Sequence, residues 1–206
     1  KSKDFYGNEI LVTISFPIMI QMDVKTKYKA KKTKIVFFDI DDTLRVKVTG
    51  YMPESIKYVF KSLKEKGIMT GIATGRSLYG VVPEIRDLNP DYFVTINGAY
   101  VVDKKEAEIV SDPLPRDLVE KYVNWAKSEG IEYGFTGKDK PAVSKRCDLI
   151  DDAMKPIYGI CDVEPDFYLT NDVYQMWTFA ENNADLQLPE DLADEIRLVP
   201  WHEHSS

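Results

Sequence analysis

Short apolar runs that end in polar residues dominate the first half of the chain. The first is Ile35–Phe38, which is followed directly by three acids within four positions. Residues 68–73 form a second run, which ends at Thr74, and residues 91–96 form a third. Short apolar runs bounded by turn-forming residues are typical of buried strands in a parallel sheet. The Asn-Gly pair after the third run predicts a tight hairpin into a further strand at 99–102.

Helical periodicity separates these predicted strands. Ile56, Val59, Phe60 and Leu63 fall at i, i+3, i+4 and i+7, and Gly67 stands where a helix would end. A second helix is predicted from residue 77 to about 88, interrupted or restarted at Pro83. Strand and helix in alternation predict an α/β fold, a doubly wound (Rossmann-like) parallel sheet.

The pattern changes after residue 104. One amphipathic helix is predicted within 113–130 and a short one near 189–195, with four strands between and after them. The four predicted strands are 131–136, 142–147, 173–179 and 196–201. Strands with helices on one side predict a smaller α+β module. We therefore expect four parts, namely a leader (1–33), the first part of a core (34–104), a second module (105–202) and a short linker (203–206).

Composition narrows the class of protein. A net charge of −7 over 206 residues argues against nucleic acid as the main partner. The apolar stretch at 10–22 contains Pro17 and is too short to span a membrane. Cys147 and Cys161 are the only cysteines and show no metal or disulfide spacing, which favours free thiols in a reducing cytosol. The oligomeric state is not predicted.

Two polar clusters occupy corresponding places in the first two strand–helix units. Asp39, Asp41 and Asp42 follow the first strand, and Thr74-Gly75-Arg76 follow the second. Neighbouring parallel strands end at one edge of the sheet, where open α/β folds bind ligands. A Thr hydroxyl and an accessible glycine N–H suit a phosphate oxygen, and Arg76 adds charge nearby. Taken alone, the acids could be only a turn or a helix N-cap.

The two clusters together resemble motifs of the haloacid dehalogenase superfamily, specifically its Cof-like type IIB phosphatases. FDIDDTL resembles motif I, IATGR resembles motif II, and INGAYV resembles the hairpin that leads into the family's C2-type cap. The resemblance implies that Asp39 is a nucleophile that forms an aspartyl-phosphate, and that Asp41 is the general acid and base.

The same resemblance implies a Mg²⁺ cofactor held by the Asp39 carboxylate and the backbone carbonyl of Asp41. The phosphoryl group of the substrate is expected to bind to Thr74 and Gly75, together with Asp42 and Thr43. The substrate is expected to be a small phosphorylated metabolite, a class that includes the sugar phosphates. Arg76 and Asn97 are expected to contact substrate. A hard cation that touches both carboxylate and phosphate would remove the repulsion between them.

Two further motifs of the family are not recognisable in the sequence: a Lys that fixes nucleophile and phosphate, and a GDGxND-like acidic loop. We therefore expect an incomplete phosphatase, in which these 206 residues alone hydrolyse phosphate esters poorly or not at all. Ile35–Phe38, a central strand in the family, would then become a sheet edge. The alternative is a complete but degenerate protein, in which the apolar run Ile10–Ile20 would pair with that open edge.

Two other function classes stay open. A metal–nucleotide glycosyltransferase using DxD would leave Thr74-Gly75-Arg76 unexplained. A non-catalytic binding or regulatory protein on the same scaffold would explain the missing motifs. His202 and His204 have the spacing of a metal pair on a strand, but the sequence shows no third ligand nearby, which favours solvated histidines.

Overall fold

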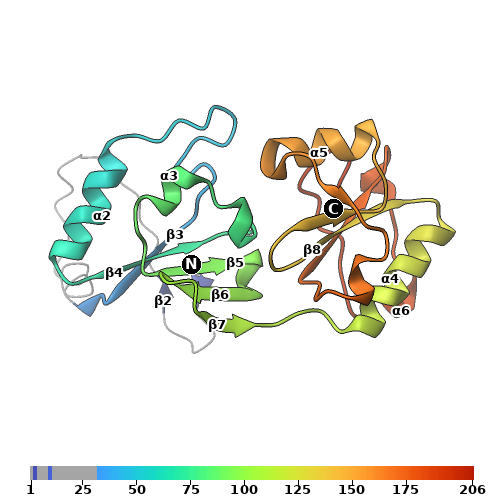
Figure 1. Ribbon diagram of the computed structural model, residues 1–206, viewed down its shortest axis with the longest axis horizontal. Coiled ribbons are helices and arrows are strands. Elements are labelled where there is room, and N and C mark those ends of the chain that lie inside the picture. The colour runs from blue at the N-terminus through green and yellow to red at the C-terminus, as the bar shows by residue number, and fades with distance from the viewer. Residues whose placement is uncertain (1, 4–8, 11–31) are drawn as a thin grey trace. The chain divides into compact units, whose positions relative to one another are not determined.

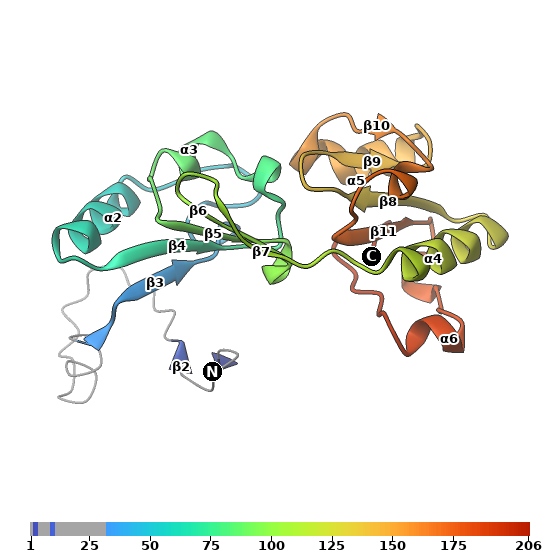
Figure 2. The same cartoon turned by 60° about the horizontal axis from the view of Figure 1, so that its bottom comes forward.

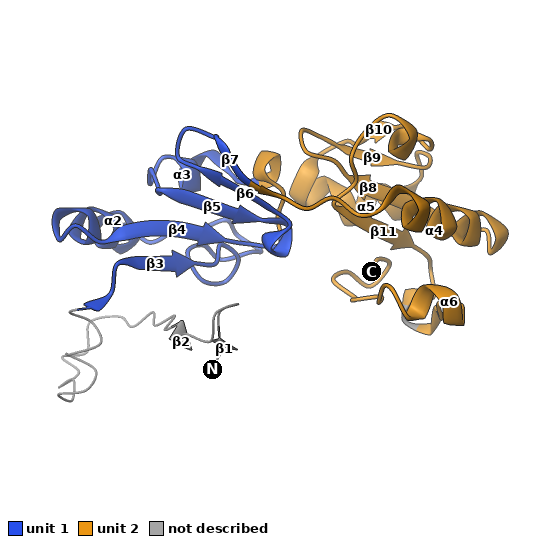
Figure 3. Cartoon of the chain, turned by 90° about the horizontal axis from the view of Figure 1, so that it is seen from below, with its two compact units in different colours: residues 1–75, 81–109 blue, residues 76–80, 110–206 orange. Residues whose placement is uncertain are grey.

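The computed structural model describes residues 2–3, 9–10 and 32–206 (Figure 1). The chain divides into two compact units, which are coloured separately in Figure 3. Unit 1 comprises Lys1–Gly75 and Val81–Ile109, and unit 2 comprises Arg76–Gly80 and Val110–Ser206. Most of the predicted leader lies outside the described residues, and so does the apolar run that was considered as a partner for the first strand. In the described part of the leader, β1 (Ser2–Lys3) and β2 (Glu9–Ile10) pair antiparallel.

A five-stranded sheet in the order β3-β4-β5-β6-β7 forms the centre of unit 1. The strands are β3 (Ile35–Phe38), β4 (Met69–Ala73), β5 (Tyr92–Thr95), β6 (Tyr100–Asp103) and β7 (Glu108–Ser111), the last of which crosses the unit boundary. β3, β4 and β5 are parallel, and β6 returns antiparallel to β5. The predicted parallel sheet and its hairpin are therefore confirmed. Among the described residues, β3 is an edge strand with β4 as its neighbour.

Apolar side chains from the sheet and its helices form the core of unit 1. Helix α2 (Ser55–Glu65) buries Ile56 and Phe60, and the Phe60 ring lies 4.9 Å from that of Phe38 between centroids. Gly67, at φ +67°, ends this helix region in the left-handed conformation that glycine adopts at low cost. The predicted second helix forms only as a short 3₁₀ turn, η1 (Leu78–Gly80), and α3 (Pro83–Arg86), because Pro83 starts a helix rather than continuing one.

Unit 2 is built on a four-stranded mixed sheet in the order β10-β9-β8-β11 (Figure 2). The strands are β8 (Glu132–Thr136), β9 (Pro141–Val143), β10 (Asp162–Val163) and β11 (Gln175–Phe179). The helices are α4 (Arg116–Ser128), α5 (Asp148–Tyr158) and α6 (Glu190–Ala193), with 3₁₀ turns η3 (Phe167–Leu169) and η4 (Asn183–Asp185). The predicted α+β architecture of this half is confirmed.

The sheet of unit 2 buries both of its faces. Tyr133 and Phe135 on β8 pack in one apolar cluster with α4 and α6. Trp177 and Phe179 on β11 pair with Gly134 and Glu132, so they point to the opposite face, where they pack against α5. Helices therefore lie on both faces rather than on one, because α5 adds a layer that the sequence analysis did not include.

Two segments of unit 2 differ from the sequence predictions. Residues 196–201 form no strand. None of these residues is buried, and Pro200 has no N–H to give to a ladder, so the predicted strand was wrong. The strand predicted at 142–147 is the shorter β9, because Cys147 already precedes the first turn of α5. None of the helices in the described ranges has the length and apolar character that crossing a membrane requires.

A short segment of unit 2 comes from the first half of the chain. Residues 76–80 contain Tyr79, whose ring lies 5.4 Å from that of Tyr158 on α5. Gly80 fits beneath the same ring, because a Cβ at Gly80 would come within 2.7 Å of Tyr158 Cε1. The turn that follows the second strand of unit 1 thus packs as part of the other unit.

Candidate active site

The residues after β3 form a tight loop that leaves the first acid in solvent. Phe38 and Ile40 are buried, whereas Asp39 between them is exposed. The carbonyl oxygen of Ile40 accepts hydrogen bonds from the N–H groups of Leu44 and Arg45, both at 3.0 Å. The buried Ile40 therefore anchors the turn, and the carboxylate of Asp39 lies beyond the end of the strand.

Asp42 holds the shape of this loop. Its φ is 56°, a left-handed conformation that Asp adopts more readily than most residues. Its N–H donates to the carbonyl oxygen of Arg45 at 2.8 Å, and its Oδ1 accepts the N–H of Lys47 at 2.9 Å. Thr43 follows, half-buried. The side chain of Asp42 thus braces the backbone around the predicted nucleophile.

Thr74 stands at the end of the neighbouring strand. In the parallel register Phe38 pairs with Ile72, so Asp39 and Thr74 both emerge at the carboxyl edge of the sheet. Thr74 is buried, and its N–H donates to the carbonyl oxygen of Val94 at 2.9 Å. The structure therefore brings the two sequence motifs to the same edge of unit 1.

Asn97 closes over the turn after β4. Its N–H donates to the carbonyl oxygen of Thr74 at 3.2 Å, and its own φ is 54°. Gly75 lies beneath its side chain, because a Cβ at Gly75 would be 3.2 Å from Asn97 Oδ1. Gly75 and Asn97 are both exposed. The amide of Asn97 and the backbone of Gly75 thus share one patch of surface.

Arg76, predicted to contact substrate, belongs to unit 2 and is buried. Its Nη1 donates to the carbonyl oxygen of Gly80 at 3.1 Å. In this structure the guanidinium therefore stabilises the turn that follows the motif.

The donor atoms of unit 1 suit a hard cation. Asp39 and Asp41 supply carboxylate oxygens, and the carbonyl of Asp41 supplies another. Both histidines and both cysteines of the chain lie in unit 2, so unit 1 offers no imidazole or thiolate ligand. Mg²⁺ prefers oxygen ligands and keeps several waters, which an exposed Asp39 would leave room for. The residues present fit Mg²⁺.

A second group of chemistry-bearing residues escaped the sequence analysis. Asp152 on α5 lies near His202 and His204, although the sequence showed no third ligand beside those histidines. The signal for it was the apolar spacing of Ile150, Ala153 and Met154, which marks one buried face of α5 and leaves Asp152 exposed.

Comparison with known proteins identifies the family of the chain. Residues 36–204 match the family model described as haloacid dehalogenase-like hydrolase. The chain belongs to this family. Its match therefore spans both units, from β3 to the segment after α6.

Two curated relatives bear provisional names as phosphatases. One, from Streptococcus pyogenes, is named a bifunctional phosphatase/peptidyl-prolyl cis-trans isomerase and is 55% identical over 90% of this chain and 39% of its own length. The other, phosphatase YkrA of Bacillus subtilis, is 26% identical over 84% of this chain and 67% of its own. The chain thus spans well under half of the first relative.

Solved structures share the fold. A hypothetical protein from Geobacillus kaustophilus superposes with a TM-score of 0.72 and 31% identity, over 84% of this chain and 67% of that one. A protein described as a subclass IIB sugar phosphatase superposes with a TM-score of 0.66 and 23% identity, over 84% of this chain and 68% of that one. The second likeness shows the fold alone.

Proposed function

We propose that this chain is part of a Mg²⁺-dependent phosphatase that acts on small phosphorylated metabolites through an aspartyl-phosphate. One observation carries the proposal: the exposed Asp39 and the buried Thr74 emerge together at the carboxyl edge of paired parallel strands. A nucleophile and a phosphate-binding hydroxyl would need that placement. Membership of a hydrolase family and relatives named as phosphatases support it.

Asp39 and Asp41 would divide the reaction into two steps. An Asp39 carboxylate oxygen attacks phosphorus while the bond to the substrate alcohol breaks and Asp41 gives that alcohol a proton. Water then attacks the same phosphorus, Asp41 takes a proton from the water, and the bond to Asp39 breaks. The products are the alcohol and inorganic phosphate, and both carboxyl groups return to their starting states.

The surrounding groups would hold the phosphoryl group in place. The Thr74 hydroxyl and the Gly75 N–H are hydrogen-bond donors for its oxygens, and Thr43 adds a second hydroxyl. Asp42 would act through the loop that it braces around Asp39. The Asp39 carboxylate and the Asp41 carbonyl would hold Mg²⁺, which would supply positive charge against the repulsion between carboxylate and phosphate.

Substrate choice would rest on groups outside this centre. Asn97 lies next to Gly75 and presents an amide that can bond a substrate hydroxyl or phosphate oxygen. We propose that unit 2 is the cap domain that selects the substrate. Arg76 would contact substrate only if its hydrogen bond to the carbonyl oxygen of Gly80 opens. Sugar phosphates are the first class to screen, and the acidic net charge of −7 disfavours nucleic acid.

A phosphate-release assay on the complete gene product, with the 206-residue chain alongside, tests the proposal. Turnover of small phosphomonoesters should require Mg²⁺, stop with EDTA and fall at least 10³-fold in Asp39→Asn. Asp87→Asn, an exposed acid of unit 1 with the same charge change, should keep full activity. With an aryl phosphate, whose leaving group needs no proton, hydroxylamine should trap the phosphorylated Asp39 of the Asp41→Asn variant, because the second step in this variant lacks a base.

The alternative, a non-catalytic binding protein on the same scaffold, predicts another pattern. It would bind phosphate esters with unchanged affinity in Asp39→Asn and release no phosphate with any substrate or metal. That result in the complete gene product would refute the phosphatase proposal.

A further inference from the structure

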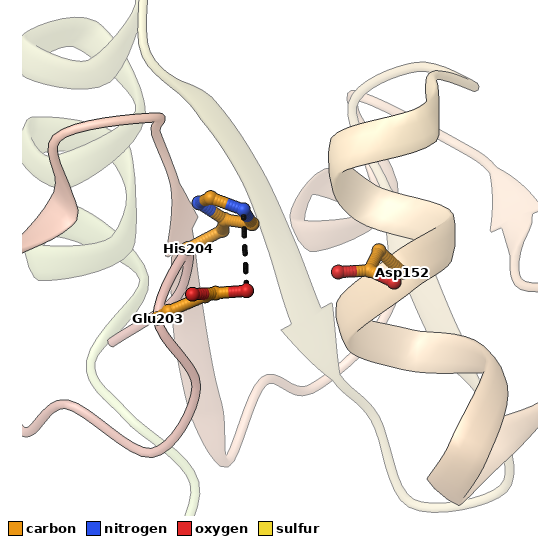
Figure 4. Close-up of side chains that lie close together, drawn as sticks. All are labelled: Asp152, Glu203 and His204. Atoms are coloured by element: carbon orange, nitrogen blue, oxygen red, sulfur yellow. Dashed lines mark ion pairs between the residues drawn. The ribbon is translucent and has the colours of Figure 1, made fainter.

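Three ligand-type side chains lie close together in unit 2, whereas the proposed active site belongs to unit 1 (Figure 4). Asp152 comes from α5, and Glu203 and His204 come from the segment after α6. One ligand atom of each lies within 4.8 Å of those of the other two, and His204 Nε2 is 3.7 Å from Glu203 Oε1. Residues about 50 positions apart in sequence thus present two carboxylates and an imidazole to one point.

The backbone holds this segment firmly against the sheet. Ser205 is fully buried and bridges to Phe179 at the end of β11. The N–H of Ala180 donates to the carbonyl oxygen of His204 at 3.0 Å. The side chains of Glu203 and His204 therefore stand on a fixed backbone, as a specific binding site requires.

The two imidazoles present different faces. His202 Nδ1 accepts the N–H of His204 at 3.2 Å, which places the His202 proton on Nε2. That Nε2 lies 3.7 Å from Asp152 Oδ2. His204 Nδ1 is buried with no hydrogen-bond partner, whereas its Nε2 faces Glu203. The ring nitrogen that a cation can reach is thus His204 Nε2, because Nδ1 is buried.

The surroundings favour positive charge. Asp152 and His204 line a hollow over α5 whose lining also includes Asp148, Asp151 and Glu181. Lys155 also lines the hollow, but it forms an ion pair with Asp151 at 3.0 Å. Acids therefore outnumber bases around the triad, and a divalent cation there would relieve the repulsion between them.

We propose that Asp152, Glu203 and His204 bind one divalent transition-metal cation of the Zn²⁺ class. Imidazole nitrogen with carboxylate oxygens suits Zn²⁺ rather than Mg²⁺. Bonds of about 2.0–2.1 Å in a tetrahedral site place ligand atoms about 3.3 Å apart. The 3.7 Å between His204 and Glu203 is close to that value, and exposed Asp152 closes the remainder by side-chain rotation. Water takes the fourth position.

The bound cation ties α5 to the segment 202–206. Because it binds the folded unit and not the unfolded chain, it stabilises unit 2, and this stabilisation grows with the logarithm of the cation concentration once the site is mostly occupied. This site lies entirely in unit 2 and does not depend on the proposed phosphatase activity.

The histidines give a specific readout, because His202 and His204 are the only two in the chain. Imidazole ¹⁵N spectra of the EDTA-treated chain, titrated with ZnCl₂ alone, should show a large shift of His204 Nε2 and a small one of His202. The midpoint of thermal unfolding should rise by several degrees in the same titration. Unchanged imidazole spectra at millimolar Zn²⁺ would overturn the proposal.

Carboxylate variants separate a built site from diffuse attraction. Asp152→Asn and Glu203→Gln should each weaken Zn²⁺ binding at least tenfold. Asp148→Asn, which removes the same charge from the same hollow, should change it less than twofold. Asp39→Asn should not change it, because that residue lies in unit 1. Equal losses in Asp148→Asn and Asp152→Asn would show only nonspecific attraction and sink the site.

Discussion

Asn97 lies against Gly75 so closely that a Cβ on the glycine would be 3.2 Å from Asn97 Oδ1. The backbone N–H of Asn97 also donates to the carbonyl oxygen of Thr74, which fixes the backbone of Asn97 next to this turn. The hairpin after β5 therefore fixes the surface beside the predicted phosphate-binding turn. The absence of a side chain at Gly75 is part of that arrangement.

Gly75→Ala should lower turnover of the complete gene product about tenfold, equivalent to ~1.4 kcal/mol in the barrier. The new methyl group displaces the Asn97 amide and crowds the phosphate. Gly75 is exposed and has no positive φ, so the free energy of unfolding should change by less than about 0.5 kcal/mol. Steady-state kinetics and denaturant unfolding measure the two effects.

Asn97→Ala supplies the control for that prediction. In its background Gly75→Ala should cost much less activity, because the methyl group no longer meets the amide. An equal loss in both backgrounds would show that the clash is not the cause.

High pH should destabilise unit 2. Burial raises the pKa of Tyr133 to about 12 and that of Cys161 to about 11. Burial also raises the pKa of Tyr79, Tyr122 and Tyr158. Between about pH 9 and 12 the unfolded chain therefore binds fewer protons than the folded one, and the free energy of unfolding falls as pH rises. Below about pH 8 these groups should have no effect.

Tryptophan fluorescence measures this loss directly. Trp125, Trp177 and Trp201 all lie in unit 2, so their emission reports the unfolding of that unit. The guanidinium midpoint should stay constant from pH 7 to 8 and then decline steadily. A constant midpoint up to pH 11 would contradict the prediction.

The two cysteines should differ in reactivity. Cys161 is 5% exposed and its pKa is raised by burial, whereas Cys147 is half-buried. Thiolate is the reactive form, so iodoacetamide at pH 8 should modify Cys147 at least tenfold faster. Peptide mass spectrometry gives both rates, and equal rates in guanidinium would confirm that the fold is the cause.

Tyr122→Phe should lower the free energy of unfolding by about 1–2 kcal/mol. Its buried hydroxyl donates to the carbonyl oxygen of Trp177 at 2.7 Å, so this bond joins α4 to the backbone of β11. Tyr133→Phe is the matched control, because its hydroxyl bond to the Pro165 carbonyl is 3.3 Å long and only partly buried. Guanidinium unfolding should show the smaller loss in the control.

The sequence predicted the first sheet well because its signals are local. Ile35–Phe38 ends in acids, and Asn97-Gly98 sits between two apolar runs, so strand ends and turn chemistry agree. The prediction that Asp39 and Thr74 emerge at the same edge of the sheet followed from parallel strand pairing alone. The same argument could not show that Asp42 bonds Lys47, because that bond depends on the path of the loop.

Unit 2 was harder to predict because its pattern is weaker. Pro156 inside α5 concealed a helix whose apolar face is nonetheless periodic. Residues 196–201 include residue types that favour strands but pair with no other strand. The pattern of apolar and polar residues does not show whether a partner strand is present. Missing α5 also hid Asp152, the carboxylate that lies near His202 and His204.

The short segment 76–80 bears on how this protein can be divided or recombined. A gene fragment starting at Val110 would encode all the strands of the second sheet yet lack Tyr79 and Gly80, which cover Tyr158. A fragment ending at Ile109 would contain Tyr79 and Gly80 but lack Tyr158, on which they pack. Unit 2 therefore cannot be exchanged as one continuous segment of sequence. Grafting it onto another protein would also require the transfer of Arg76–Gly80, which lies within the sequence of unit 1.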